Sequence, residues 1–206
     1  MSVDVRPMGR TAIVLEAAST GQVADLYERV IAARDEGEFA ATDIVPAART
    51  VLIDGIGPVD AAQVAALART WTLTEAAHDA GALVEVPVTF DGPDLDQVAD
   101  LWNTGRDDVV ETMLATPFAV AFCGFAPGFA YLSGLGAQRA VPRRRDPRPQ
   151  VPAGSVGLAG EFAGVYPRQS PGGWQLVGTV REVTLWDASR REPALLAPGV
   201  RVRFTA

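Results

Sequence analysis

Four arginines lie within the proline-rich segment VPRRRDPRPQVP, at positions Arg143, Arg144, Arg145 and Arg148. Proline restricts the residue before it to extended backbone, which limits how these side chains can collapse together. A guanidinium group held in this way can bind a carboxylate or a phosphate through two parallel hydrogen bonds. A solvated basic loop, or a loop that docks on the acidic half of the chain, explains the composition equally well.

A second segment, YPRQSPGGW, contains Tyr166, Ser170 and Trp174 around two adjacent glycines. Gly172 and Gly173 let the backbone approach a ligand closely, and their N–H groups can donate to an oxyanion. Trp174 could form the wall of a pocket. The alternative interpretation is a hairpin turn whose aromatic side chains belong to the core.

The segment GSVG places Ser155 near glycines, as in the nucleophile elbow of serine hydrolases. That pattern requires glycine two residues before the serine, where this chain has Ala153. The only histidine, His78, lies in the other half of the chain, so a Ser-His-Asp triad is not supported. Ser155 is better interpreted as a hydrogen-bond donor in a turn. For the glycines of this segment, a role in permitting tight β-turns is favoured over a role in a ligand site.

The composition excludes several classes of site. All 18 basic residues are arginine, so the chain has neither a Schiff-base lysine nor the lysine of a Walker-type ATP site. With one histidine and one cysteine, we expect no metal site. Cys123 lies in an apolar run and is predicted to be a small buried residue rather than a nucleophile. His78 is predicted to lie on the surface near the end of a helix.

The net charge of −7 is unevenly distributed, because residues 1–123 carry −13 and residues 124–206 carry +6. This small basic excess argues against nucleic-acid binding and favours a small anion or an acidic partner surface. The sequence has no run of about 18 apolar residues and no signal-peptide core, so we expect no membrane span and a cytoplasmic location.

These side chains must be positioned by a folded scaffold. In the first half, strands alternate with helices, which predicts an α+β domain of the ferredoxin-like type. The predicted strands are 11–17, 48–55 and 83–90, and the predicted helices begin near residue 21 and at Pro58 and end near Gly37 and Trp71. We place the domain boundary between residues 80 and 92, with domains at 1–85 and 86–206.

The second half is predicted to be mostly β, because residues 124–178 hold 11 of the 20 glycines and 7 of the 15 prolines together with six aromatic residues. Two short helices precede this region. Asp94 is predicted to cap the first, which ends at Trp102, and the second covers 106–114. Strands are predicted at 118–125, 181–187 and 199–204. These strands are expected to form a closed or nearly closed barrel.

The chain contains four ordered motifs, GFAPGFAYLSGL (124–135), PRRRDPR (142–148), VPAGSVGLAG (151–160) and VYPRQSPGGWQLVG (165–178). Together they closely resemble the family of B-type 5-oxoprolinase subunits, also described as allophanate hydrolase subunit one. The resemblance implies a small α+β domain followed by a cyclophilin-like β-barrel. It further implies a hydrolase subunit, inactive alone, that works with a C-type partner subunit, and with an A-type subunit, to open 5-oxoproline to L-glutamate.

The same resemblance implies ATP as cosubstrate, at a site completed by a partner. On this basis we expect Arg143 and Arg148 to bind anionic groups of a small substrate. Ser155, Tyr166, Ser170 and the amides of the two glycines in YPRQSPGGW are expected to orient its amide.

The chain also departs from the family pattern. Met113 stands where many members have histidine, Val200 stands where they often have aspartate near the C-terminus, and Gly9-Arg10 replaces an N-terminal Gly-Asp. The family includes Kip-type proteins that inhibit a sensor histidine kinase. A regulatory binding protein is therefore one alternative, and a carboxyltransferase component related to urea carboxylase is another.

Overall fold

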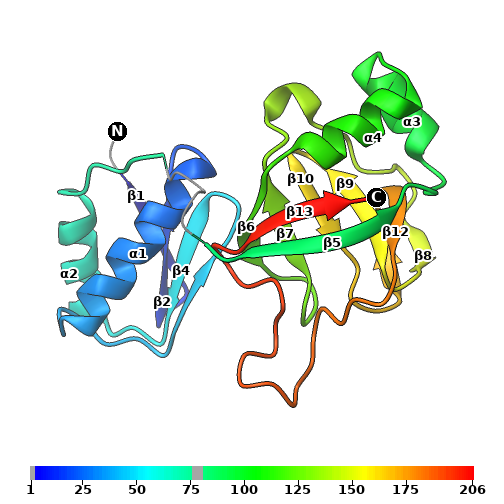
Figure 1. Cartoon of the computed structure of the whole chain (residues 1–206). Helices are drawn as coiled ribbons and strands as arrows, with labels where there is room; N and C mark the ends of the chain where they lie inside the picture. Colours follow the sequence, from blue (N-terminus) through cyan, green and yellow to red (C-terminus); the bar gives the residue numbers. More distant parts are fainter. Residues whose placement is uncertain (1–2, 76–80) are drawn as a thin grey trace. The chain divides into compact units, whose positions relative to one another are not determined.

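The computed structural model describes residues 3–75 and 81–206, and it forms two compact units, Met1–Ala77 and His78–Ala206 (Figure 1). His78, for which a surface position was predicted, lies outside the described residues. The first unit encloses one cluster of buried apolar side chains, and the second unit encloses two. Each is therefore described by itself.

The first unit is one antiparallel sheet with two helices. Its elements are β1 (Asp4–Met8), β2 (Ala12–Glu16), α1 (Gly21–Asp35), β3 (Asp43–Pro46), β4 (Thr50–Asp54) and α2 (Pro58–Ala68). The strands lie in the order β1-β2-β4-β3. The apolar residues Val23, Leu26 and Val30 recur at helical spacing and bury one face of α1.

The strand order is that of a ferredoxin-like sheet, except that the N-terminal strand β1 occupies the edge position that the last strand of that fold usually has. We predicted that residues 83–90 would complete this sheet, and that prediction is wrong. β1 occupies the edge beside β2, pairing Asp4 with Glu16 through Met8 with Ala12. Exposed and half-exposed residues throughout β1 hide the alternation by which a strand is recognised.

The helix α2 begins with Pro58 after Gly57, as expected for a proline at the first helical position. It ends at Ala68, three residues before the predicted end. Val64 and Ala68 are buried, whereas Val59 is 78% exposed. Val59 lies in the first turn, on the face of the helix that does not meet the sheet.

The second unit is a closed seven-stranded barrel in the order β10-β7-β6-β13-β5-β12-β9, which confirms the predicted barrel. Its elements are β5 (Leu83–Thr89), α3 (Leu95–Trp102), α4 (Arg106–Ala115), β6 (Phe118–Cys123), β7 (Ala130–Ser133), the 3-10 turn η1 (Ala137–Arg139), β8 (Arg148–Val151), β9 (Ser155–Ala159), β10 (Phe162–Val165), β11 (Ser170–Gly172), β12 (Gln175–Val180) and β13 (Arg201–Thr205). β8 and β11 form a separate two-stranded sheet.

The barrel closes through its first and last strands. β13 runs parallel to β5 and antiparallel to β6, while β5 also pairs with β12. A domain boundary between residues 85 and 86 would divide β5, whereas the two compact units separate before it, between Ala77 and His78. Long-range pairing with β13 assigns β5 to the barrel, and no local pattern in the sequence reports that pairing.

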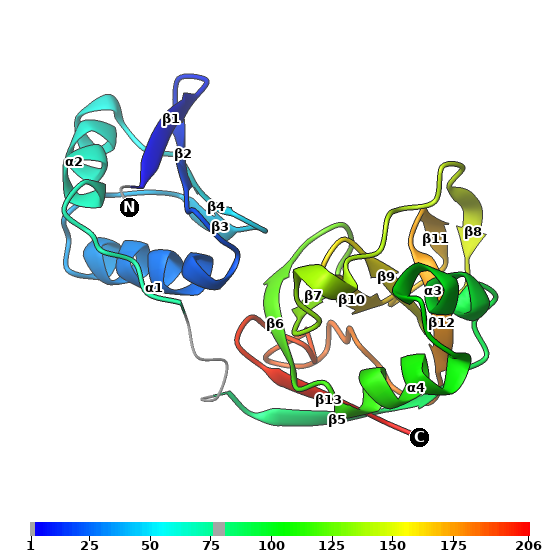
Figure 2. The same cartoon turned by 90° about the horizontal axis from the view of Figure 1, so that it is seen from above.

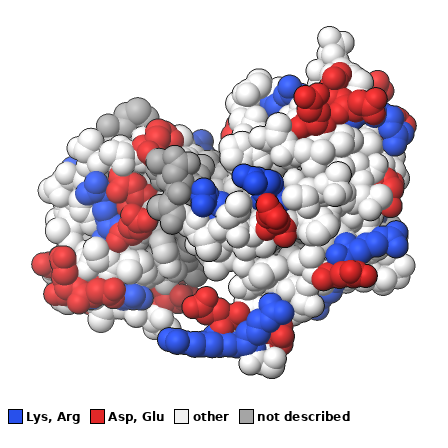
Figure 3. All heavy atoms as spheres, viewed as in Figure 1, with Lys and Arg blue, Asp and Glu red and all other residues white. Residues whose placement is uncertain are grey.

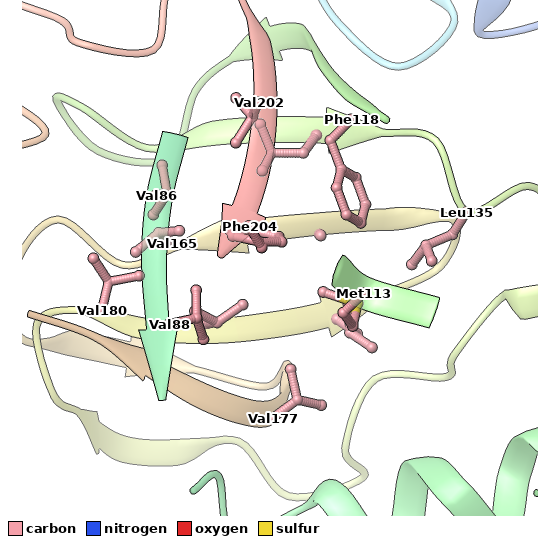
Figure 4. Packing of buried hydrophobic residues seen from close by; sticks show 14 of the residues in the cluster. Val86, Val88, Met113, Phe118, Leu135, Val165, Val177, Val180, Val202 and Phe204 are labelled. Carbon is pink, nitrogen blue, oxygen red and sulfur yellow. The ribbon is translucent and has the colours of Figure 1, made fainter. Parts of the chain in front are cut away.

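Apolar side chains from all sides fill the interior of the barrel (Figure 4). Phe118 and Phe204 meet edge to face with their ring centres 5.2 Å apart. Met113 from α4 is fully buried in the same cluster. The residue at this departure from the family pattern therefore contributes to the core of the barrel.

The two helices α3 and α4 contact each other and pack beside strands β12 and β13, respectively (Figures 1 and 2). Acidic side chains gather over this part of the unit (Figure 3). The two helices carry Asp96, Asp100, Asp107, Asp108 and Glu111. No helix in residues 3–75 or 81–206 combines the length and the apolarity that a membrane crossing demands.

The strand predicted at 181–187 does not form. Only an isolated bridge between Trp186 and Ala194 is present there. Glu182 adopts a left-handed backbone conformation, with φ of 63°, which interrupts the extended run. The apolar residues of this segment have the right composition for a strand, but Leu185 is buried against the barrel core from a loop.

Candidate functional site

A small pocket of about 60 Å³ lies on the second unit. Side chains and backbone of three separate segments form its walls: the end of β6 with β7, the arginine segment before β8, and the Tyr166–Trp174 segment. It is lined by Phe125, Phe129, Tyr131, Arg143, Tyr166, Gly172, Gly173 and Trp174. Its volume suits one small polar group of a ligand, since sites for whole drug-sized molecules have about 300–1,000 Å³.

The walls of the pocket are a cluster of aromatic rings. Phe129 contacts Tyr166 and Trp174 edge to face, each with ring centres 5.3 Å apart. Tyr131 contacts Trp174 at 5.5 Å. Phe129, Tyr166 and Trp174 are each less than 5% exposed. Rings locked in this way give the pocket a fixed shape and a low local dielectric, which strengthens any charge interaction within it.

The two glycines allow the backbone to approach the aromatic cluster. A side-chain carbon added to Gly172 would overlap the phenol oxygen of Tyr166. Gly173 faces Pro147, with 3.6 Å between its added carbon and the proline ring. The glycine at position 172 is therefore required for the backbone to cover the phenol, whereas the close approach predicted from the sequence was to a ligand.

Arg143 is exposed and lines the pocket. It makes no ion pair with any carboxylate in the part of the chain that the structure describes. Arg144 and Arg148 behave differently, because both donate to Asp94. Of the two arginines predicted to bind anionic groups, the structure therefore places only Arg143 at the pocket.

The carboxylate of Asp94 is 4% exposed and accepts three hydrogen bonds. Its Oδ1 accepts from Nη1 of Arg144 at 3.0 Å and from Nη2 of Arg148 at 2.8 Å. Its Oδ2 accepts from the backbone N–H of Leu176 at 2.6 Å. We predicted that Asp94 would cap α3. It does precede the helix, but its side chain makes no capping hydrogen bond.

Burial raises the pKa of the Tyr166 phenol, although the backbone N–H of Trp174 and the guanidinium groups of Arg143 and Arg148 oppose that shift. A raised pKa keeps the phenol protonated at neutral pH. Its O–H group can therefore donate a hydrogen bond to an oxygen of a ligand. Beside it, the Arg143 guanidinium can pair with a carboxylate.

The two predicted serines are not among the residues that line the pocket. Ser155 is buried at the start of β9, where its backbone carbonyl accepts from the N–H of Tyr166. Ser170 is in β11, and its hydroxyl group is 3.5 Å from the carbonyl oxygen of Arg168. The structure thus brings together Arg143 and the YPRQSPGGW residues other than Ser170, but not the whole predicted set.

The sequence interpretation did not predict three aromatic residues of the pocket, although the motif GFAPGFAYL contains all of them. They are Phe125, Phe129 and Tyr131. Phe125 is 59% exposed at φ of 66°, an uncommon conformation for a bulky side chain. The N–H of Ala126 bonds the carbonyl of Gly124 at 2.7 Å, which makes Phe125 the centre of a strained three-residue turn. Such strain at an exposed aromatic residue is the signal that marks the rim of the pocket.

Comparison with known proteins places this geometry in a family. Residues 3–196 match the family model described as carboxyltransferase domain, subdomain C and D. The B-type 5-oxoprolinase subunit of Escherichia coli O157:H7 is 37% identical over 208 residues, which cover 96% of this chain and 93% of that protein.

Solved structures agree with this family at the level of the fold. The crystal structure of TTHA0988 has a TM-score of 0.73 at 30% identity and covers 95% of this chain, which spans 39% of that chain. The Kluyveromyces lactis urea carboxylase has a TM-score of 0.80 at 20% identity and covers 98% of this chain, which spans 21% of that chain. At 20% identity the likeness shows the fold alone. With its barrel, its motifs and these similarities, this chain belongs to the B-type 5-oxoprolinase family of carboxyltransferase-domain proteins.

Proposed function

We propose that this chain is one subunit of an ATP-dependent 5-oxoprolinase and that it opens 5-oxoproline to L-glutamate together with a C-type partner subunit. The observation that carries the proposal is the pocket in which Arg143 and the neutral phenol of Tyr166 face the same small space. Membership of the B-type 5-oxoprolinase family supports the choice of substrate.

Because the pocket suits one small polar group, the substrate would place its lactam oxygen inside it and its carboxylate at the mouth, where Arg143 is exposed. Its carboxylate would pair with the guanidinium group of Arg143, the only charged side chain among the lining residues that the structure describes. Its lactam oxygen would accept from the Tyr166 phenol and from the N–H groups of Gly172 and Gly173. Trp174, which is 4% exposed, would form the wall beside the lactam oxygen and exclude water from it.

We propose further roles for the predicted residues outside the pocket. Arg148 would add positive potential near the phenol of Tyr166, on which it already acts. Ser155 and Ser170 would orient the amide only through the backbone segments that carry them. These roles are indirect, because none of the three side chains lines the pocket.

The pocket does not fit a nucleotide, since its volume is about 60 Å³. Nor does the chain contain a lysine that could bind phosphates in a Walker-type site. We therefore propose that a C-type or A-type subunit holds most of the ATP and that the assembly works in the cytoplasm, where ATP is available. Bound ATP would supply the phosphoryl group that makes the lactam carbon a better electrophile, while this chain binds and orients the lactam.

The test is reconstitution of the complex. The chain is purified with a tagged C-type subunit, an A-type subunit is added, and ADP release is measured with and without 5-oxoproline. The proposal expects co-purification and ADP release that depends on 5-oxoproline and on every subunit. ADP release by this chain alone would contradict the two-subunit arrangement, and no release with all subunits present would contradict the activity.

The carboxyltransferase description of the family favours a second candidate, a ureido substrate. The same assay distinguishes the two, because allophanate or urea would replace 5-oxoproline as the compound that stimulates ADP release. A carboxyl-transfer reaction would in addition require a biotin carrier. Stimulation by 5-oxoproline without such a carrier would exclude this candidate.

A further inference from the structure

We propose that Asp94 is a positioning residue that holds two of the three walls of the pocket, the arginine segment and the Tyr166–Trp174 segment, and leaves Arg143 as the free cation of the pocket. This inference rests on the proposed function, in which Arg143 binds the carboxylate of the substrate. Asp94 lines no part of the pocket itself. It lies immediately before α3, about 50 residues from the arginine segment in sequence.

The first link runs from Asp94 to the arginine segment. Its Oδ1 binds Arg144 at 3.0 Å and Arg148 at 2.8 Å, so one oxygen fixes both ends of the turn that follows Arg143. Arg144 is the chain neighbour of Arg143. Fixing its side chain therefore fixes the direction in which Arg143 leaves the backbone.

The second link runs from Asp94 to the opposite wall. Its Oδ2 accepts from the N–H of Leu176 at 2.6 Å, and its own N–H donates to the carbonyl of Leu176 at 2.9 Å. Leu176 stands two residues after Trp174. The N–H of Arg144 donates to the carbonyl of Gly173 at 2.8 Å, which ties the two walls directly to each other. Asp94 thus joins the arginine segment to the residues that follow Trp174.

The charge of Asp94 is essential to this arrangement. Two guanidinium groups share one carboxylate, and neither pairs with another carboxylate in the part of the chain that the structure describes. Nε of Arg144 and Nη1 of Arg148 are buried and have no hydrogen-bond partner there. Removal of the carboxylate charge would leave two part-buried cations facing each other. They would repel and separate, and the walls would move with them.

The first experiment compares Asp94→Asn with Asp96→Asn in the reconstituted complex. Asp96 is the matched control, because it lies two residues further on and pairs only with Arg106 on the surface. Asp94→Asn should raise the KM for 5-oxoproline about tenfold or more, as loss of an aligned charge-assisted bond does, with a kcat within about threefold of wild type. Asp96→Asn should change neither constant. An unchanged KM for Asp94→Asn would overturn the proposal.

The second experiment needs no activity. Amide hydrogen exchange is followed in the full-length chain for the segments 142–148 and 172–178. Asp94→Asn should accelerate exchange in both segments together, by about tenfold or more at the amide of Arg144, while the strands of the first unit keep their protection. Unchanged exchange in either segment would overturn the proposal that one residue holds both walls.

A third variant separates positioning from a general loss of folding. The double variant Asp94→Asn/Arg148→Gln lacks one of the two guanidinium groups that Asp94→Asn leaves without a carboxylate. The KM and the exchange rate of the 142–148 segment should return at least about threefold towards wild type, because the remaining arginine no longer faces a like charge. No recovery in either quantity would assign Asp94 a merely structural role.

The two proposals fail in different ways. If the wild-type complex releases no ADP with 5-oxoproline, the proposed function fails, and hydrogen exchange alone decides whether Asp94 holds the walls. If the wild-type complex is active but Asp94→Asn leaves KM and exchange unchanged, the function stands and the role of Asp94 is excluded.

Discussion

At the scale of single residues, three adjacent arginines have three different environments. Arg144 is half-buried on Asp94, whereas Arg143 and Arg145 are exposed. The buried carboxylate of Asp94 holds Arg144 inward, and no such ion pair holds its two exposed neighbours in the part of the chain that the structure describes. Of the two outward arginines, only Arg143 lines the pocket.

This difference predicts the effect of removing each charge. Arg143→Ala should raise the KM for 5-oxoproline about tenfold or more, because a charge-assisted hydrogen bond contributes about 1.5–3 kcal/mol. Arg145→Ala removes the same charge two residues away and should leave KM unchanged. Steady-state ADP release by the reconstituted complex measures both variants. Equal effects of the two would show that only the overall charge of the segment matters.

The phenol of Tyr166 predicts a dependence on alkaline pH. Its pKa in the folded chain is raised above about 10, the usual value, mainly by burial. The stability that the neutral phenol contributes is therefore fully present below about pH 10 and is lost as the pH rises through the folded pKa. Tyr166→Phe should flatten the decline of the free energy of unfolding above pH 10.

Denaturant unfolding of the wild-type chain and of Tyr166→Phe measures this decline. It is carried out from about pH 8 to about pH 11 in steps of about one pH unit. Tyrosine ionisation is also followed by absorbance in the folded wild-type chain and in Tyr166→Phe. The difference between the two titrations gives the ionisation of Tyr166, which should occur only above pH 10. Ionisation of that tyrosine below pH 10 would contradict the raised pKa.

At the scale of elements, the last strand closes the barrel. β13 alternates strictly: Val202 and Phe204 are buried, whereas Arg203 is exposed. Its two neighbours, β5 and β6, come from parts of the chain more than 75 residues away. The barrel therefore depends on a strand that the chain supplies only at the end.

This alternation predicts unequal costs for two adjacent substitutions. Phe204→Ala should lower the free energy of unfolding by about 3–5 kcal/mol, since it removes a fully buried ring that contacts Phe118. Arg203→Ala should change it by less than about 0.5 kcal/mol, because its pair with Glu85 is exposed on both sides. Guanidinium unfolding of both variants measures the difference. A similar loss in both would contradict the register of β13.

At the scale of the whole molecule, the chain has two units with separate cores. The core of the first contains residues up to Ala68, and the two clusters of the second begin at Val86. Each unit has its own sheet system, and no strand pairing joins them in the described residues. Each therefore meets the physical definition of a domain.

Separate folding is the expected consequence. A fragment of residues 81–206 should unfold cooperatively and keep the near-ultraviolet circular dichroism of its packed aromatic cluster. A fragment of residues 1–75 should keep helical and strand signals in the far ultraviolet. The sum of the two spectra should match that of the intact chain. Loss of cooperative unfolding in both fragments would show that the units stabilise each other.

Local patterns predicted most helices and several strands, because amphipathic spacing and turn residues act over a few positions. The barrel was also predictable, since glycine and proline exclude helix and aromatic residues require a core. Of the residues predicted from YPRQSPGGW, the structure places Tyr166, Gly172, Gly173 and Trp174 at the pocket. β1 and the loop at 181–187 were not predictable. The exposed residues of β1 hide its alternation, and one left-handed residue interrupts the extended run at 181–187; composition records neither.

The amino-acid sequence by itself determined the chemical inventory of this protein: a lysine-free chain, a proline-rich segment with four arginines, and adjacent glycines that permit close approach of the backbone. Only the tertiary structure decided which arginine faces the pocket, because that choice depends on Asp94, a residue about 50 positions away in sequence. A carboxylate before a helix has the same local appearance whether it caps that helix or pairs with two guanidinium groups. Contacts between distant segments distinguish the two, and they exist only in the folded chain.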